Sequence, residues 1–286
     1  MSRLHFHYDD RAPRVSTHTH AQHRSGVDLM SLIERGDRIV KDWNWWSWFL
    51  ARHYYGTGEE RRTWDRLESS LVRSLGLQSG MSVLDLGCGC GEIDFRLAQR
   101  GVDMLGLDHS ELLIEDCRRV GIQREIPAEF VRGDMFDLDL PSPFDRILSL
   151  NTSFGYGSDD ENRELLVDVA DLLNDDGVFY LNVLVADVAE PFGLWSDFVL
   201  DGTLYVDNSW DAASNVMTSW PYWISNDNRT VFTSDLPEVV RIYHSDEIEE
   251  MMRSSDLKPQ RLEDAMGLAL PPKTANQMVT WIATKG

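Results

Sequence analysis

A glycine-rich turn between an expected strand and an expected helix is the strongest chemical signal in this sequence. The string runs from Asp85 to Gly91 and reads Asp-Leu-Gly-Cys-Gly-Cys-Gly, directly after the apolar residues Val83 and Leu84. Glycine has no Cβ, so the chain can turn tightly there and a ligand can approach the backbone closely. The first turn of the following helix also offers free N–H groups. The turn is therefore predicted to bind a ligand.

Two ligand classes use a turn of this kind, and Glu92 separates them. The dinucleotide fingerprint G-x-G-x-x-G/A needs a small residue beside the pyrophosphate. Glu92 occupies that position here, and its carboxylate would repel phosphate groups. The string instead resembles D/E-x-G-x-G-x-G, the S-adenosylmethionine (SAM) signature of class I methyltransferases, and SAM carries no phosphate. The resemblance implies cofactor contacts from Asp85, Gly87, Cys88, Gly89 and Gly91.

The resemblance continues at the ends of the next two expected strands. Asp108 and His109 follow the second strand, and the resemblance implies that the carboxylate binds the ribose hydroxyls of SAM. Asp134 and Met135 follow the third strand, where family members bind the adenine amino group and pack on the ring. The resemblance also puts Tyr55 near the amino-acid end of SAM. It therefore implies SAM as the cofactor and S-adenosylhomocysteine as its product.

Polar residues follow the fourth expected strand, 144–150, and we expect them to face the methyl group. In parallel α/β sheets, ligands bind beyond the carboxyl ends of the strands. Segment 151–156 resembles the T-S-F-G-Y segment of a bacterial small-molecule methyltransferase subgroup, and Asn151 and Ser153 are candidate cofactor contacts. Segment 241–248, R-I-Y-H-S-D-E-I, resembles the start of a late helix in that subgroup. Tentative bases or positioning groups for catalysis are His53, Tyr156 and His244.

Aromatic residues gather in two segments outside the expected sheet, and they are predicted to enclose the methyl acceptor. Tryptophans combine a large apolar area with a polar N–H, which suits a pocket for an apolar or aromatic molecule. A cation held over a tryptophan face is compatible with the same residues. The predicted substrate-pocket residues are Trp46, Tyr54, Thr152, Phe154, Trp195, Trp220 and Trp223.

The order of expected elements predicts an α/β fold. Strands alternate with helices, which is typical of a Rossmann-like, seven-stranded, mostly parallel sheet with helices on both faces. A helical N-terminal cap is expected before the sheet, and an antiparallel β insertion, or lid, within it. The lid strands are expected near 198–205, 216–222 and 230–232. The predicted divisions are a flexible arm 1–25, the helical cap 26–78, the SAM-binding core 79–186, the lid 187–240 and the end of the sheet 241–286.

Composition and charge narrow the range of partners. The chain has 48 acidic and 27 basic residues, a formal net charge of −21, which disfavours a nucleic-acid substrate. No apolar run is long enough to span a membrane. The three cysteines form no disulfide framework, which is typical of a reduced, cytoplasmic protein, and no metal site is predicted. The expected partner is a small-molecule acceptor, and a homodimer is compatible with the sequence.

The function predicted from these features is SAM-dependent transfer of a methyl group to a small molecule, in specialised metabolism. Displacement at a sulfonium carbon depends mainly on positioning and on excluding water, so no catalytic motif is required. Oxygen is slightly preferred over nitrogen or carbon as the acceptor atom. Two alternatives stay open: a SAM-fold protein with non-methylating chemistry, such as cyclisation or decarboxylation, and a non-catalytic SAM-binding protein.

Overall fold

The computed structural model describes residues 29–54, 60–140, 143–187, 193–262 and 278–286. Its centre is a seven-stranded sheet with the order β12-β13-β6-β5-β2-β3-β4. Strand β13 is antiparallel to both of its neighbours, and the central strands are parallel. The strands of this core sheet are β2 (Ser82–Leu86), β3 (Asp103–Asp108), β4 (Glu129–Arg132), β5 (Phe144–Ser149), β6 (Leu173–Leu184), β12 (Leu257–Leu262) and β13 (Met278–Lys285).

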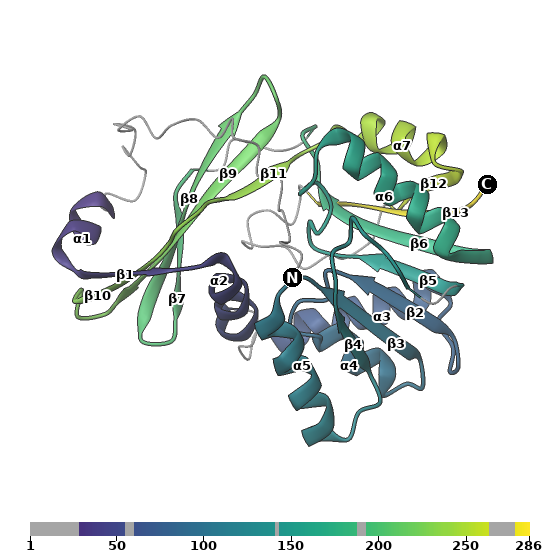
Figure 1. The fold of residues 1–286 in the computed structure, drawn as a ribbon, viewed down its shortest axis with the longest axis horizontal. Helices are drawn as coiled ribbons and strands as arrows, with labels where there is room; N and C mark the ends of the chain where they lie inside the picture. The colour runs from purple at the N-terminus through teal and green to yellow at the C-terminus, as the bar shows by residue number, and fades with distance from the viewer. Residues whose placement is uncertain (1–28, 55–59, 141–142, 188–192, 263–277) are drawn as a thin grey trace, which may run out of the picture.

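Helices cover both faces of the core sheet (Figure 1). Apolar residues of α3, α4 and α5 pack on one face, and those of α6 and α7 pack on the other. Strands with apolar residues on both sides are typical of parallel sheets buried between helix layers. The helices are α3 (Glu60–Leu75), α4 (Glu92–Ala98), α5 (Glu111–Arg124), α6 (Asp159–Leu172) and α7 (Ser245–Ser254). The predicted Rossmann-like fold class is confirmed.

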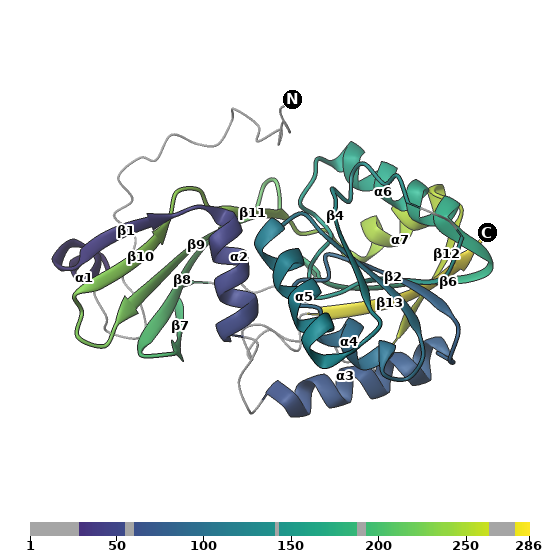
Figure 2. The same ribbon diagram turned by 60° about the horizontal axis from the view of Figure 1, so that its bottom comes forward.

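A second sheet lies beside the core sheet (Figures 1 and 2). Its strand order is β1-β10-β9-β8-β7, and β11 pairs with the same edge of β9 as β10 does, farther along the strand. Its strands are β1 (Asp37–Lys41), β7 (Trp195–Val199), β8 (Gly202–Asp211), β9 (Val216–Ser225), β10 (Thr230–Ser234) and β11 (Glu238–Arg241). The N-terminal helices are α1 (Leu29–Arg35), α2 (Trp43–Phe49) and the π-helix η1 (Leu50–Tyr54).

Helix α2 stands between the second sheet and α5 in both views (Figures 1 and 2). On one side, Trp46 and Phe49 are buried in a cluster with Trp223 of the second sheet. On the other side, the Asn44 side chain lies 2.5 Å from the Ser110 hydroxyl at the start of α5. The helix therefore holds the second sheet against the end of β3. Among the described residues, no helix has the length and apolarity needed to cross a bilayer.

Two local predictions are wrong. The expected strand 198–205 is two strands, β7 and β8, because the chain turns at Leu200, whose φ is +58°. The cap 26–78 is not wholly helical, since β1 lies within it and pairs in parallel with β10. The β-branched residues Ile39 and Val40 explain this, because they favour a strand and follow the helix break at Gly36. The predicted arm 1–25 lies outside the described residues, and the domain boundaries stay predictions.

Candidate functional site

The glycine turn joins the carboxyl ends of three strands. The N–H groups of Gly87 and Cys88 donate to the carbonyl oxygen of Leu107 on β3, at 2.8 and 3.0 Å. The φ of Gly87 is +77°, and a Cβ there would lie 2.6 Å from Ser153 Oγ in the loop after β5. The φ of Gly89 is +55°, but within the part of the chain that the structure describes no atom lies within 4 Å of the position of its missing Cβ. Gly87 thus permits close packing, while the Cβ position of Gly89 is open among these residues.

Asp108 is fixed at the end of β3 by backbone groups. Its Oδ2 accepts the N–H of Gly89 at 3.0 Å, and its Oδ1 accepts the N–H of Ser110 at 2.9 Å. His109 follows it and is half-exposed, with Nδ1 3.6 Å from Asp108 Oδ1. A carboxylate has about four acceptor sites, so Asp108 retains capacity for further donors. This arrangement can bind a pair of hydroxyl groups beside the glycine turn.

Asp134 and Met135, the predicted adenine contacts, lie beside the same turn. Asp134 Oδ1 accepts the N–H of Phe136 at 3.0 Å, which leaves its second oxygen for other donors. The methyl carbon of Met135 lies 3.9 Å from the position that a Cβ on Gly87 would take. The structure therefore brings together three residue groups that are far apart in the sequence.

Asp85 lies at the carboxyl end of β2, directly before the turn, and it is buried. Asp85 is 2% exposed, and among its charged neighbours the completely buried Asp94 of α4 affects its pKa most. Burial and the charge of Asp94 raise the pKa of Asp85 well above its ordinary value, and burial raises the pKa of Asp94 to about 7. Among the described residues, Asp85 Oδ1 and both Asp94 oxygens have no donor. The two carboxyls are therefore placed to share a proton, and the cofactor contact of Asp85 stays a prediction.

Cys88 is a second predicted contact whose side chain faces inward. Its thiol is buried, and its sulfur lies 2.9 Å from the place of a Cβ on Gly106 of β3. Burial raises the pKa of this thiol well above its ordinary value. The side chain thus packs the turn onto the sheet, and only the backbone of Cys88 can face a ligand.

The loop after β5 begins with two residues in the left-handed region. Asn151 and Thr152 have φ values of +53° and +65°. Their N–H groups donate to the Asn182 side chain and carbonyl of β6, at 3.4 and 3.1 Å. The Thr152 hydroxyl accepts the N–H of Leu184 at 3.3 Å, so it serves the fold. Asn151 Oδ1 is buried without a donor among the described residues.

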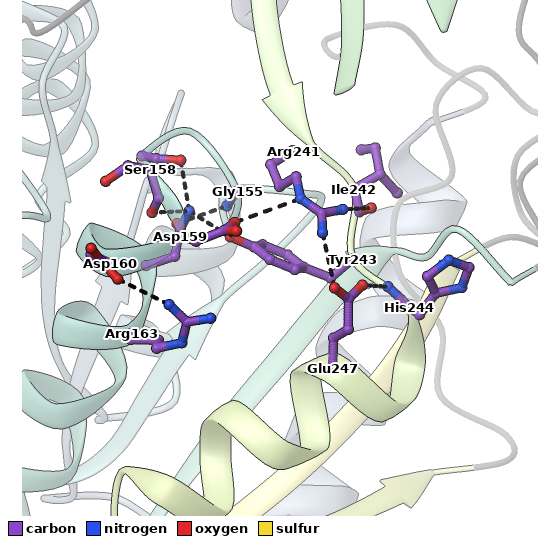
Figure 3. Close-up of polar contacts among 12 residues, drawn as sticks. Gly155, Ser158, Asp159, Asp160, Arg163, Arg241, Ile242, Tyr243, His244 and Glu247 are labelled. Carbon is purple, nitrogen blue, oxygen red and sulfur yellow. Dashed lines mark hydrogen bonds and ion pairs between the residues drawn. The ribbon is translucent and has the colours of Figure 1, made fainter. Parts of the chain in front are cut away.

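A polar network fixes the next part of this loop (Figure 3). The buried Asn162 side chain accepts the N–H of Gly155 at 3.3 Å and donates to the carbonyl oxygen of Gly157 at 2.8 Å. It also donates to the Tyr243 hydroxyl at 3.1 Å, which in turn donates to Asp159 at 2.7 Å. Segment 241–248 thus has a structural role, because it attaches this loop to α6 and α7.

Tyr156, a predicted catalytic residue, reaches from this loop to the second sheet. Its hydroxyl donates to the Glu238 carboxylate of β11 in a short hydrogen bond. Burial raises the pKa of Glu238, and the hydrogen bond from Tyr156 partly offsets that effect. The backbone supports the contact, since the Arg241 N–H donates to the Gly155 carbonyl at 2.8 Å.

His244, the second predicted catalytic residue, is oriented by a carboxylate. Its Nδ1 lies 2.8 Å from Asp187 Oδ1, and Asp187 Oδ2 accepts the N–H of Ser245 at 2.8 Å. These hydrogen bonds lower the pKa of Asp187 against the opposing effect of burial. His53 lies elsewhere, packed on the rings of Trp48 and Phe49 at 5.3 Å, and burial lowers its pKa. The structure therefore does not join the three catalytic candidates in one cluster.

The predicted aromatic pocket is only partly assembled. Phe154 is 1% exposed and packs on Tyr243 in the main core, and Trp46 is completely buried under the second sheet. Both side chains are therefore corrected to core positions. Trp220 lies on the opposite face of β9 from Trp223, because side chains alternate along a strand. Trp195 shares a face with Trp223, whose Nε1 donates to the Val199 carbonyl at 2.9 Å. Tyr55 and the Tyr54 side chain lie outside the described residues.

Four residues of this region were not predicted: Asp94, Asn162, Asp187 and Glu238. Asp94 and Asn162 are polar residues on the buried sides of α4 and α6. Helical periodicity could have identified them, because it places each of them on a side that is otherwise apolar. Asp187 and Glu238 carry no local signal, because their partners are 57 and 82 residues away in the sequence.

The comparison with known families identifies the region around this turn. Residues 83–177 match the family described as methyltransferase domain. The chain therefore carries a class I methyltransferase domain. This confirms the methyltransferase class predicted from the turn.

Similar proteins support the same domain. A putative methyltransferase of Geobacillus sp. is 28% identical over 121 residues, which cover 42% of this chain and 49% of that protein. The cypemycin N-terminal methyltransferase of Streptomyces sp. is 35% identical over 104 residues, 36% of this chain and 42% of that protein. The methyltransferase domain thus matches less than half of the length of these curated relatives.

Solved structures resemble a larger part of the chain. The methyltransferase CcbJ from Streptomyces caelestis has a TM-score of 0.67 and 18% identity, over 78% of this chain and 90% of that chain. The sugar N-methyltransferase KedS8 from Streptoalloteichus sp. has a TM-score of 0.64 and 17% identity, over 87% and 95%. At this identity the likeness shows the fold alone, and it covers a larger share of the chain than residues 83–177 do.

Proposed function

We propose that this protein transfers a methyl group from SAM to a small-molecule acceptor. The observation that carries the proposal is the junction of Gly89 and Asp108, where the carboxylate is fixed on the turn and the glycine borders open space. A cofactor lying over Gly89 would fill the space that a Cβ would otherwise take. The neighbouring Asn151 oxygen, buried without a donor among the described residues, supplies an acceptor for an N–H group.

The donors and acceptors present suit SAM. Asp108 would bind the ribose hydroxyls, and Asp134, through its second oxygen, would bind the adenine amino group. Met135 would pack against the adenine, and the Asn151 oxygen would accept a hydrogen bond from an amino group. None of these groups is a cation placed for a phosphate, which agrees with a cofactor that has none. When bound, SAM supplies an activated methyl carbon.

The protein's own contribution is then to place the acceptor and exclude water. The network around Asn162 fixes the loop that bears Tyr156, and Tyr156 joins that loop to Glu238 of the second sheet. The second sheet and α2 flank the carboxyl ends of the core strands (Figure 1). We infer that the acceptor placed at this end of the sheet is a small molecule. A role in specialised metabolism, a cytoplasmic location and a homodimer stay predictions.

Calorimetry with SAM and with S-adenosylhomocysteine tests the first half of the proposal, and Asp108→Asn is the matched variant. We expect saturable binding to the wild type and weaker binding to the variant. No heat of binding at millimolar SAM would contradict the proposal. Incubating the protein with SAM and candidate acceptors then separates the alternatives. Release of S-adenosylhomocysteine indicates methyl transfer, whereas a changed acceptor with intact SAM indicates non-methylating chemistry.

A further inference from the structure

One row of polar residues crosses the inward face of the second sheet. Glu238 of β11 pairs with Ser219 of β9, and Ser219 pairs with Asn208 of β8. Directly paired residues of antiparallel strands point to the same face of a sheet. The side chains of the row therefore share one face, and the contact between Tyr156 and Glu238 shows that this face meets the loop after β5.

Apolar clusters flank the row on both sides. On one side, Val240 and Met217 of the same face pack with Ile242 and Leu184 at the end of the core sheet. On the other side, Val206, Leu204 and Trp223 of this face pack with residues of α2. The polar row thus lies between two buried apolar clusters, one packed with α2 and one at the end of the core sheet. A small number of polar groups among apolar residues is typical of ligand sites.

Glu238 differs from its neighbours in the row because its charge is uncompensated. Ser219 donates to the Asn208 side chain at 2.7 Å, and Asn208 donates to the Gly193 carbonyl at 3.1 Å. Glu238 accepts a hydrogen bond from Tyr156, yet within the described ranges no lysine, arginine or histidine forms an ion pair with it. Glu238 is partly buried, and a carboxylate that loses part of its contact with water costs free energy unless an opposite charge compensates it. A cationic ligand can supply the positive charge that would compensate Glu238.

We propose that the acceptor is a small-molecule amine and that Glu238 binds its ammonium group and takes one proton from it. This inference rests on the proposed methyl transfer. An ammonium nitrogen has no lone pair, so it must lose a proton before it can attack a carbon. One N–H bond breaks and an O–H bond forms on Glu238. The freed lone pair forms the N–CH₃ bond, and the electrons of the S–CH₃ bond remain on sulfur.

The negative charge of Glu238 distinguishes an amine from an alcohol. An alcohol can donate a hydrogen bond to Glu238, but it leaves the negative charge in place. An ammonium group donates and also compensates that charge, and charge-assisted hydrogen bonds are about twice as strong as neutral ones. Nitrogen therefore replaces oxygen as the preferred acceptor atom. Tyr156, which holds the Glu238 carboxylate, acts as its positioning residue.

The test compares benzylamine with benzyl alcohol, two probes of the same carbon skeleton, on protein saturated with S-adenosylhomocysteine. Saturation-transfer NMR and calorimetry measure the two dissociation constants. We expect the wild type to bind the amine at least ~10-fold more tightly, which is about 1.4 kcal/mol. Glu238→Gln keeps the shape of the side chain and should reduce that ratio to about one. Glu238→Asp, which keeps the charge, should retain part of it.

Asp207→Asn is the matched control. Asp207 lies on β8 next to Asn208 but on the opposite face of the sheet, paired with Trp220, and its variant removes the same single charge. Asp207→Asn should keep the wild-type ratio of affinities for the amine and the alcohol. Equal affinity for the two probes, no binding of either at millimolar concentration, or an amine preference that survives Glu238→Gln would overturn the inference. Failure of S-adenosylhomocysteine to bind would instead refute the proposed function.

Discussion

Gly89 and Gly76 offer a matched pair of substitutions that tests where the cofactor lies. Both have left-handed backbone, with φ values of +55° and +59°, and neither has an atom of the described residues within 4 Å of the place of a Cβ. Alanine at either position therefore creates the same backbone strain and no clash within the described residues. Only Gly89 borders the proposed cofactor site, since Gly76 follows α3. Comparing the two alanine variants therefore separates the effect of backbone strain from the effect of obstructing the ligand.

We expect each alanine variant to lower the free energy of unfolding by about 1 kcal/mol, because a left-handed residue with a Cβ costs ~1–2 kcal/mol. Gly76→Ala should bind SAM like the wild type. Gly89→Ala should bind at least ~10-fold more weakly, a loss of about 1.4 kcal/mol or more, because its methyl group would occupy the space of the cofactor. Urea denaturation measures the first quantity, and calorimetry with SAM measures the second.

Two results would refute this reasoning. If Gly89→Ala bound SAM within about twofold of the wild type, the cofactor would not pass over this glycine. If Gly76→Ala lost as much affinity, the loss would come from a weakened fold and not from the site. Measuring both variants well below their melting temperatures keeps the affinity values independent of unfolding.

Three further substitutions test single contacts. Asp108→Asn removes the charge from the proposed ribose site and should weaken SAM binding by about 1.5–3 kcal/mol in calorimetry. Asn162→Leu leaves the Gly155 N–H without its partner and should lower the free energy of unfolding by about 3 kcal/mol in urea denaturation. Ser158→Ala removes the side-chain cap of α6 and should cost about 1 kcal/mol in the same assay, with SAM affinity unchanged.

The core sheet and the cofactor residues could be predicted because their signals are local. A buried strand followed by a glycine turn and a helix needs only neighbouring residues to be recognised, and Asp108 follows its strand directly. Asp85 illustrates the limit of such a pattern. The signature gives its place in the chain, but the depth of its side chain depends on Asp94 of the next helix and on packing.

The acceptor side could not be predicted to the same extent, because it depends on pairing between distant segments. Trp220 and Trp223 look equivalent in the sequence, yet the register of β9 places them on opposite faces. Phe154 follows the same strand as Asn151, but it turns into the core, where Tyr243 meets it. The proposed role of Glu238 follows only from the folded structure, in which β11 pairs with β9 and Tyr156 donates a hydrogen bond to Glu238. Strand register and inter-sheet contacts are long-range properties.

The paired carboxyls of Asp85 and Asp94 make the fold sensitive to pH in a definite direction. The pKa of both groups is raised in the folded protein, so the folded state binds the shared proton more tightly than the unfolded chain does. Their contribution to stability is therefore fully present below the unfolded pKa near 4 and is lost as pH rises through the folded values. For Asp94 alone, the rise from 3.8 to about 7 corresponds to on the order of 4 kcal/mol.

Asp94→Asn tests this directly, because its amide can donate permanently to Asp85 and replaces the shared proton. At about pH 8 we expect the variant to unfold at higher urea concentration than the wild type, and at about pH 5 the difference should shrink. Asp103→Asn, an exposed change on β3, should leave the pH dependence as it is in the wild type. If Asp94→Asn and the wild type kept a constant difference across this range, the two carboxyls would not share a proton. Their burial beneath the glycine turn would then need another source of compensation, such as an ordered water molecule bound to both.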